Sequence, residues 1–211
     1  MTNYRFNVDW KAQWAAYGLN FHDGFVHVPI QKTILKLEPG PGFGDLSHPT
    51  TRLTLKLMSQ NISDQTVLDM GCGSGILALG AIAMGSPFAY GIDIDPEAIT
   101  HAQHNAQING MQDQTFFCTA GKFTALPNDK PLVLAMNMIR TEQEQAWKAL
   151  QPVHKKIHTC LTSGVMSEER EIYLKQCQEW GWELVQVIEE EGWLGFHLKN
   201  AQGWARREGK L

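Results

Sequence analysis

The stretch that decides the fold is VLDMGCGSGIL at residues 67–77, followed at residues 91–99 by GIDIDPEAI. Apolar residues lead into a glycine-rich turn and a helix-like run, and a second apolar segment then ends on a carboxylate. This order predicts a β-strand, a loop that opens an α-helix, and a neighbouring parallel strand. Such a loop holds adenosine-containing cofactors, so we expect the binding site here.

Strand-like and helix-like segments alternate along the rest of the chain. Strands are expected at residues 66–70, 88–93, 115–119, 131–138 and 156–161, and helices at residues 75–84, 96–109, 141–150 and 167–180. Two final segments, residues 183–188 and 193–199, predict an antiparallel hairpin. We therefore predict an α/β fold of the Rossmann-like type, with a mostly parallel sheet, helices on both faces and this hairpin at its C-terminal end.

The first 60 residues have a different character. A short helix is expected at residues 9–17, one extended piece at residues 25–28, a loop rich in Gly and Pro at residues 37–47, and a helix that begins at His48-Pro49-Thr50-Thr51. We expect a helical and loop extension at residues 1–60, a cofactor-binding domain at residues 61–200 and a tail at residues 201–211.

Composition excludes several classes of protein. The 211 residues are 43% hydrophobic and 19% charged, without an apolar run that could cross a membrane and without a secretory signal, so a cytoplasmic location is expected. The net charge of -4 offers no general attraction for nucleic acid. Four widely spaced cysteines predict reduced thiols rather than a zinc site, and no metal is expected.

The glycine loop and two carboxylates define the predicted site. Gly71, Gly73 and Gly75 allow a tight turn that brings the backbone close to a ligand. Asp69 ends the first strand, where it could receive a cationic ligand group or backbone N–H donors. Asp93 ends the second strand, where a carboxylate accepts hydrogen bonds from both ribose hydroxyls.

Two cofactors compete for this arrangement. Nicotinamide dinucleotides prefer G-x-G-x-x-G, with a pyrophosphate at the helix N-terminus, and this chain lacks that spacing. S-adenosylmethionine carries no phosphate and presents a positive amine, which suits an acidic strand end. The phrase VLDMGCGSGILAL resembles motif I of class I S-adenosylmethionine-dependent methyltransferases. That resemblance implies S-adenosylmethionine as the cofactor.

A wider resemblance covers residues 8–199. The chain resembles the bacterial ribosomal protein L11 methyltransferase family, which methylates amino groups of a ribosomal protein, in the segments LEPGPGFGDLSHPTT, VLDMGCGSGILALGA, GIDIDPEAI, HNAQING, AMNMI and SGVM. In that family the first segment closes over the cofactor, and the Asn that ends the fourth strand orients the substrate amine. The resemblance implies a catalytic role for Asn137, which could also be a turn residue. His48 is a second catalytic candidate because it could accept a proton at neutral pH, although it could also be a helix cap or a cofactor-packing residue.

The predicted cofactor contacts follow from the motif and the resemblance together. They are Phe43, Thr50, Thr51, Asp69, Gly71, Cys72, Gly73, Gly75, Asp93, Ile94 and Asn137.

The chain departs from the family pattern in two places. The family's Phe-Gly-Thr-Gly step reads Phe43-Gly44-Asp45-Leu46, so a glycine is lost and a carboxylate is gained. If Asp45 faces the reaction chamber, it would bind an ammonium group but hinder its deprotonation. The family also carries an N-terminal domain that grips the ribosomal protein, and we expect this chain to lack it.

Three hypotheses of function remain open. The first is a methyltransferase acting on an amino group of a protein. The second is a methyltransferase of a small molecule or nucleic acid, although the acidic balance argues against a polynucleotide. The third is an inactive module that binds the cofactor.

Overall fold

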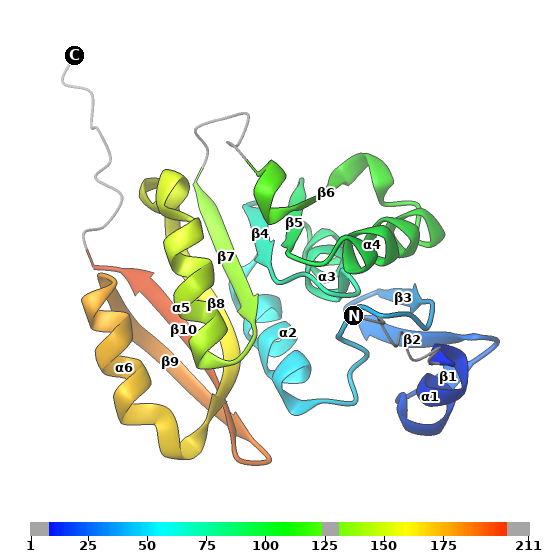
Figure 1. Cartoon of the computed structure of the whole chain (residues 1–211), viewed down its shortest axis with the longest axis horizontal. Coiled ribbons are helices and arrows are strands. Elements are labelled where there is room, and N and C mark those ends of the chain that lie inside the picture. The colour runs from blue at the N-terminus through cyan, green and yellow to red at the C-terminus, as the bar shows by residue number, and fades with distance from the viewer. Residues whose placement is uncertain (1–8, 124–130, 202–211) are drawn as a thin grey trace, which may run out of the picture.

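A seven-stranded sheet is the centre of the fold in the computed structural model, which describes residues 9–123 and 131–201 (Figure 1). The strands lie in the order β6-β5-β4-β7-β8-β10-β9. Their bounds are β4 (Thr66–Met70), β5 (Ala89–Asp93), β6 (Thr115–Thr119), β7 (Leu132–Asn137), β8 (Ile157–Met166), β9 (Trp182–Glu190) and β10 (Trp193–Asn200). Strands β4 to β8 are parallel, and β10 pairs antiparallel with β8 and β9. The predicted sheet and its hairpin are confirmed.

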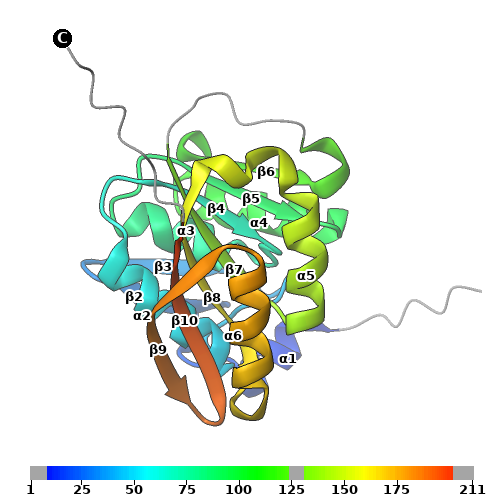
Figure 2. The same cartoon turned by 90° about the vertical axis from the view of Figure 1, so that its left-hand side faces the viewer.

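Helices cover both faces of this sheet (Figure 2). One face carries α2 (Pro49–Asn61), α3 (Ile76–Ala83) and α4 (Pro96–Ile108), and the other carries α5 (Arg140–Ala149) and α6 (Arg170–Glu179). Short 3-10 turns are η1 (Gln112–Gln114), η2 (Ala120–Lys122), η3 (Gln151–Lys156) and η4 (Ser167–Glu169). None of the helices in the described ranges has the length and apolar character needed to cross a membrane.

Successive strand residues serve two separate cores. In β4, Val67 joins the core beneath α2, α3 and α4, whereas Leu68 joins the core beneath α5 and α6. Val133 and Leu134 repeat this alternation in β7. Because side chains alternate across a strand, a continuous apolar run is what a sheet covered on both faces requires.

The N-terminal region contains more strand than the sequence predicted. Helix α1 (Trp10–Tyr17) precedes an antiparallel sheet of β1 (Phe21–His22), β2 (Phe25–Ile30) and β3 (Thr33–Leu37). The extended piece expected at residues 25–28 lies in β2, whereas β1 and β3 were not predicted. Strand β3 packs on α3 and α4. Asn105 of α4 and Asn109, which follows the helix, accept hydrogen bonds from the backbone N–H groups of Glu38 and Lys36, each at 2.9 Å. These bonds fix the chain where it enters the loop at residues 38–48.

Candidate active site

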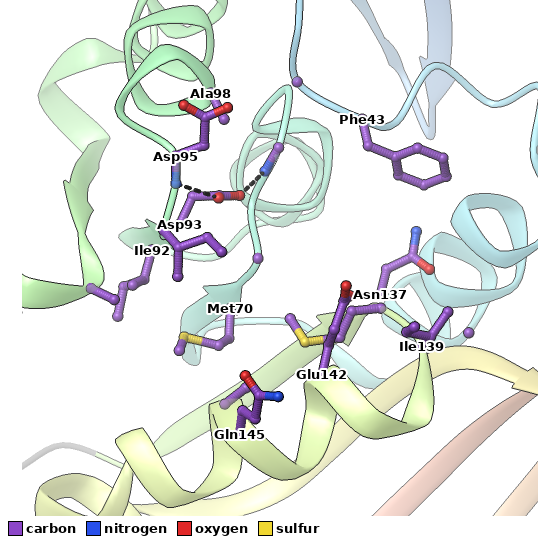
Figure 3. A pocket seen from close by; sticks show the side chains of 18 of the residues that line it. Phe43, Met70, Ile92, Asp93, Asp95, Ala98, Asn137, Ile139, Glu142 and Gln145 are labelled. Carbon is purple, nitrogen blue, oxygen red and sulfur yellow. Dashed lines mark hydrogen bonds between the residues drawn. The ribbon is translucent and has the colours of Figure 1, made fainter. Parts of the chain in front are cut away.

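A cavity of about 870 Å³ lies where the parallel strands β4, β5 and β7 end (Figure 3). Figure 3 shows Asp93 on one side, Phe43 and Asn137 on the other, and Glu142 and Gln145 projecting from α5. Eight of the predicted site residues line it: Phe43, His48, Thr50, Gly71, Gly73, Asp93, Ile94 and Asn137. Four others, Thr51, Asp69, Cys72 and Gly75, do not line it.

The glycine turn after β4 forms the floor of the cavity. Gly71 and Gly73 have φ angles of +77° and +52°, the left-handed region that favours glycine. A Cβ atom at Gly73 would lie 2.5 Å from the carbonyl oxygen of Phe43, so the loop at residues 38–48 rests directly on the turn. Gly71 N donates to Ile92 O at 2.7 Å. The backbone of this turn therefore lines the cavity, and the loop leaves no room for a side chain at Gly73.

Asp93 stands at the end of β5 and faces the cavity. Its Oδ2 accepts from Gly73 N and its Oδ1 from Asp95 N, both at 3.0 Å. A carboxylate offers about four acceptor positions, so these bonds orient the group and still allow it to accept from ligand hydroxyls.

Asp69 lies behind the cavity and caps a helix. It is fully buried, and its Oδ2 accepts from Ala78 N in the first turn of α3 at 3.1 Å. Burial raises the pKa of its carboxyl to about 8, and its Oδ1 has no hydrogen-bond partner in the described part of the chain. Helix α3 thus receives an acidic group of the chain itself where a dinucleotide-binding helix would receive a pyrophosphate.

Two side chains fix the first half of the loop at residues 38–48. Ser74 N donates to Phe43 O at 2.9 Å, and Ser74 Oγ donates to Gly44 O at 2.7 Å. His101 accepts from Gly42 N through Nδ1 at 3.1 Å, and its Nε2 lies 2.7 Å from Glu38 O. With Nδ1 as an acceptor, Nε2 carries the hydrogen that Glu38 O accepts. Burial lowers the pKa of His101, consistent with a neutral ring.

The second half of the loop keeps an unusual backbone. Leu46, which stands where the resembled family has glycine, has a φ of +73°. Arg52 holds it through Nη1, which donates to Leu46 O at 2.8 Å and to Ser47 O at 2.9 Å. The same guanidinium donates to Glu190 at 2.6 Å and to Glu191 at 2.7 Å, at the tip of the β9–β10 hairpin. Arg52 therefore joins the loop to the hairpin.

Asp45 is not among the residues that line the cavity. Its Oδ1 accepts from both the N–H and the hydroxyl of Ser47. The acquired carboxylate thus organises the loop rather than contributing charge to the cavity lining.

An aromatic group closes one side of the cavity. His48 contacts Phe43 and Trp193 edge to face, with ring centroids 5.7 and 5.0 Å apart. His48 caps α2, where its Nδ1 accepts from Thr50 N, and burial and then the nearby Arg52 lower its pKa. These contacts favour capping and packing, and proton transfer by His48 stays a prediction.

Asn137 ends β7 and is anchored from behind. Its Nδ2 donates to Thr51 Oγ1 at 3.2 Å, and Thr51 is fully buried in α2. The remaining polar atom of this amide, Oδ1, can act only as an acceptor. Thr51 therefore lies one contact away from the cavity, behind Asn137.

Sequence reasoning missed Trp193, Glu142 and Gln145, which also line the cavity. The helix α5 begins just after Asn137, so its first turns lie near the end of β7. Glu142 and Gln145 are three residues apart and therefore share one face of this helix, which could have predicted that both reach the cavity. Trp193 reaches the site only through the pairing of β10 with β8, which no local pattern reveals.

Comparison with known proteins assigns the chain to a family. A family model described as ribosomal protein L11 methyltransferase matches residues 7–201. A ribosomal protein L11 methyltransferase of Glaesserella parasuis is 35% identical over 199 residues, covering 88% of this chain and 65% of the relative. One of Neisseria meningitidis serogroup A is 36% identical over 160 residues, covering 75% and 52%. The chain thus spans less than two thirds of the length of these relatives.

Solved structures agree on the fold. A ribosomal protein L11 methylase of Lactobacillus delbrueckii has a TM-score of 0.68 at 23% identity, covering 82% of this chain and 89% of that chain. A tRNA (uracil-54, C5)-methyltransferase of Pyrococcus abyssi, in complex with S-adenosyl-L-homocysteine, has a TM-score of 0.60 at 16% identity, covering 84% and 45%. At these identities the likeness concerns the fold alone.

Proposed function

This chain belongs to the ribosomal protein L11 methyltransferase family, and from that premise we propose that it transfers a methyl group from S-adenosylmethionine to an amino group of a protein. The position of Asn137 supports the proposal most, because this residue ends β7 and lines the cavity. Ribosomal protein L11, the acceptor in the relatives' name, is the first candidate.

The residues of the cavity fit the cofactor. The backbone of Gly71 and Gly73, which lines the cavity, would lie against its amino acid part, and Asp93 would accept from its ribose hydroxyls. Asp69 already occupies the start of α3, which argues against a dinucleotide. When bound, S-adenosylmethionine supplies a methyl group on a positively charged sulfur that an amine nitrogen can displace.

The charges of the lining support a cationic cofactor and an amine acceptor. Asp93, Asp95 and Glu142 contribute carboxylates, and no Lys or Arg lines the cavity within residues 9–123 and 131–201. A phosphate-rich acceptor would meet repulsion at such a surface. This balance favours a protein amine over a nucleic acid.

The proposed role of Asn137 is to orient the acceptor. Its Oδ1 would accept a hydrogen bond from the substrate amine and so direct the nitrogen lone pair. Phe43, His48 and Trp193 would exclude water from this chamber. We propose a cytoplasmic location as well, which the four buried and unpaired cysteines support.

A labelling experiment tests the proposal. The purified chain is incubated with S-adenosylmethionine carrying a labelled methyl group and either bacterial extract or purified ribosomal protein L11. Label should enter protein and resist ribonuclease, and Asn137→Ala should slow its entry about 100-fold. Gln178→Ala, an exposed change on α6, serves as the control. Label confined to RNA or metabolites would reject the acceptor class, and no label with any acceptor would support the inactive module.

A further inference from the structure

We infer that Gln143, a buried residue of α5 outside the cavity, is a positioning residue that holds the Asn137 end of β7 in place. The inference rests on the proposed function, because it concerns how the Asn137 amide is presented to an amine. Gln143 is fully buried, and it does not line the cavity.

The donor side of the Gln143 amide extends the sheet beyond its last pair. Asn137 and Ser163 are the final partners in the ladder between β7 and β8. Gln143 Nε2 donates to Met138 O at 2.8 Å and to Ser163 O at 3.0 Å. A side chain therefore bridges the two strands where the backbone ladder ends. Strand ends fray unless such groups are paired.

The acceptor side fixes the orientation of the same amide. Gln143 Oε1 accepts from Thr162 Oγ1 at 3.0 Å and from Tyr173 OH at 2.6 Å. All four bonds of the amide are thereby made, by groups on β8, on α6 and at the end of β7. A buried amide with this bonding cannot turn or shift without losing several partners at once.

The bridge acts directly behind the cavity wall. Gly164, which lines the cavity, has a φ of +100°, and a Cβ atom there would lie 2.1 Å from Met138 O. Met138 also lines the cavity, next to Asn137. Its carbonyl is thus pressed against β8 and held by Gln143. Release of that carbonyl would let the Asn137 backbone move, and small displacements of a positioning group lower reaction rates strongly.

Two substitutions separate positioning from stability. Gln143→Met removes both bonds to the carbonyls of Met138 and Ser163, whereas Tyr173→Phe removes one bond to Gln143 and leaves those two in place. Both disturb the same buried network, so both are expected to lower the thermal unfolding temperature. Only Gln143→Met should alter the presentation of Asn137.

Calorimetry with two cofactor analogues provides the readout without an acceptor. S-adenosylhomocysteine lacks the methyl group, and sinefungin carries an amine in its place. The preference is the Kd for S-adenosylhomocysteine divided by the Kd for sinefungin. Asn137→Ala should lower this ratio most. Gln143→Met should lower the ratio at least fivefold, while the Kd for S-adenosylhomocysteine itself changes less than twofold. Tyr173→Phe should stay within twofold of the unaltered chain. The side-chain amide NMR signal of Asn137 should shift in Gln143→Met alone.

The outcomes distinguish this inference from the proposed function. An unchanged preference in Gln143→Met, or equal losses in Gln143→Met and Tyr173→Phe, would overturn the positioning role. Failure of the unaltered chain to bind either analogue would instead overturn the proposed function. If Gln143→Met does not fold, Gln143→Glu takes its place, since it keeps the acceptor for Thr162 and Tyr173 but cannot donate to both carbonyls. The same loss of preference is expected.

Discussion

Asn137 is the residue on which the proposed chemistry depends most. It is the only side-chain amide at the end of a central strand that lines the cavity within the described ranges, and Thr51 holds its nitrogen. Its position and its acceptor oxygen suit an amine, because Oδ1 could accept a hydrogen bond from the N–H group of that amine.

Replacement of Asn137 by Ala should therefore separate chemistry from binding. We expect kcat for the protein acceptor to fall about 100-fold, the lower range for loss of a polar group that acts in the transition state. The Kd for S-adenosylhomocysteine should change less than threefold, because Gly71, Gly73 and Asp93 remain. Single-turnover kinetics and calorimetry provide the two values. Weakened binding of S-adenosylhomocysteine with kcat unchanged would show that Asn137 serves binding only.

The sequence predicted well which residues at the strand ends line the cavity, but it did not separate them from Asp69 and Thr51, which lie behind the lining. Gly71, Gly73, Asp93 and Asn137 line the cavity because a parallel sheet brings its strand ends to one edge. Asp69 belongs to the same motif, but a buried carboxyl near a helix start bonds that helix first. A motif shows which residues surround a ligand without showing which face it.

In the loop at residues 38–48, the second half depends on the side chain of Arg52. Leu46 is held in a left-handed conformation that costs a non-glycine residue about 1–2 kcal/mol. Such conformations persist where neighbours over-determine them, and Arg52 does this through two carbonyls and two carboxylates.

Arg52→Lys should loosen this loop, because an ammonium group cannot reproduce the planar fork. We expect the free energy of unfolding to fall by about 1–2 kcal/mol, the value of charge-assisted hydrogen bonds at a partly buried site. Proteolysis within residues 38–48 should also become faster. Lys56→Ala, an exposed change on the same helix, should stay within about 0.5 kcal/mol. Equal stability in Arg52→Lys and the unaltered chain would contradict the clamp.

The missed N-terminal sheet shows where local patterns succeed and fail. The turn between β1 and β2 is Asp23-Gly24, with φ angles of +53° and +85°, a hairpin signal that was present in the sequence. The next turn places Gln31 at a φ of +52°, and Gln gives no such signal. Strand β8 was expected to end at residue 161, yet it continues to Met166. Its added residues pair with β10 and, up to Ser163, with β7, and such pairing is not visible in a local pattern.

At the scale of the whole molecule, the buried carboxyl of Asp69 should make the free energy of unfolding depend on pH. Its folded pKa of about 8 lies above its ordinary value of 3.8, so between these values the unfolded chain has lost a proton that the folded chain retains. Stability therefore falls as pH rises through this window, by up to about 1.4 kcal/mol per unit from this group. Asp69→Asn should gain stability relative to the unaltered chain from pH 5 to pH 8 in urea unfolding. A constant difference would disprove the buried neutral carboxyl.

His101 should act in the opposite direction, at the junction of the N-terminal sheet and the central fold. Folding lowers the pKa of His101. Its contribution to the free energy of unfolding is therefore complete above about pH 6.5 and is lost as the pH falls through the folded pKa. Protonation would remove the acceptor for Gly42 N. Unfolding measured from pH 7.5 to pH 5 should show a shallower loss for His101→Gln than for the unaltered chain. Parallel curves would mean that the ring does not titrate during unfolding.

The most direct test of the whole account is calorimetric titration of the chain with S-adenosylhomocysteine, and with NAD as the competing choice. We predict binding of S-adenosylhomocysteine, no binding of NAD, and affinity weakened at least about tenfold by Asp93→Ala, the loss of a charged hydrogen-bond acceptor. The exposed change Asp113→Ala should leave affinity unchanged. Binding of NAD in place of S-adenosylhomocysteine, or full affinity in Asp93→Ala, would contradict the assignment of this cavity.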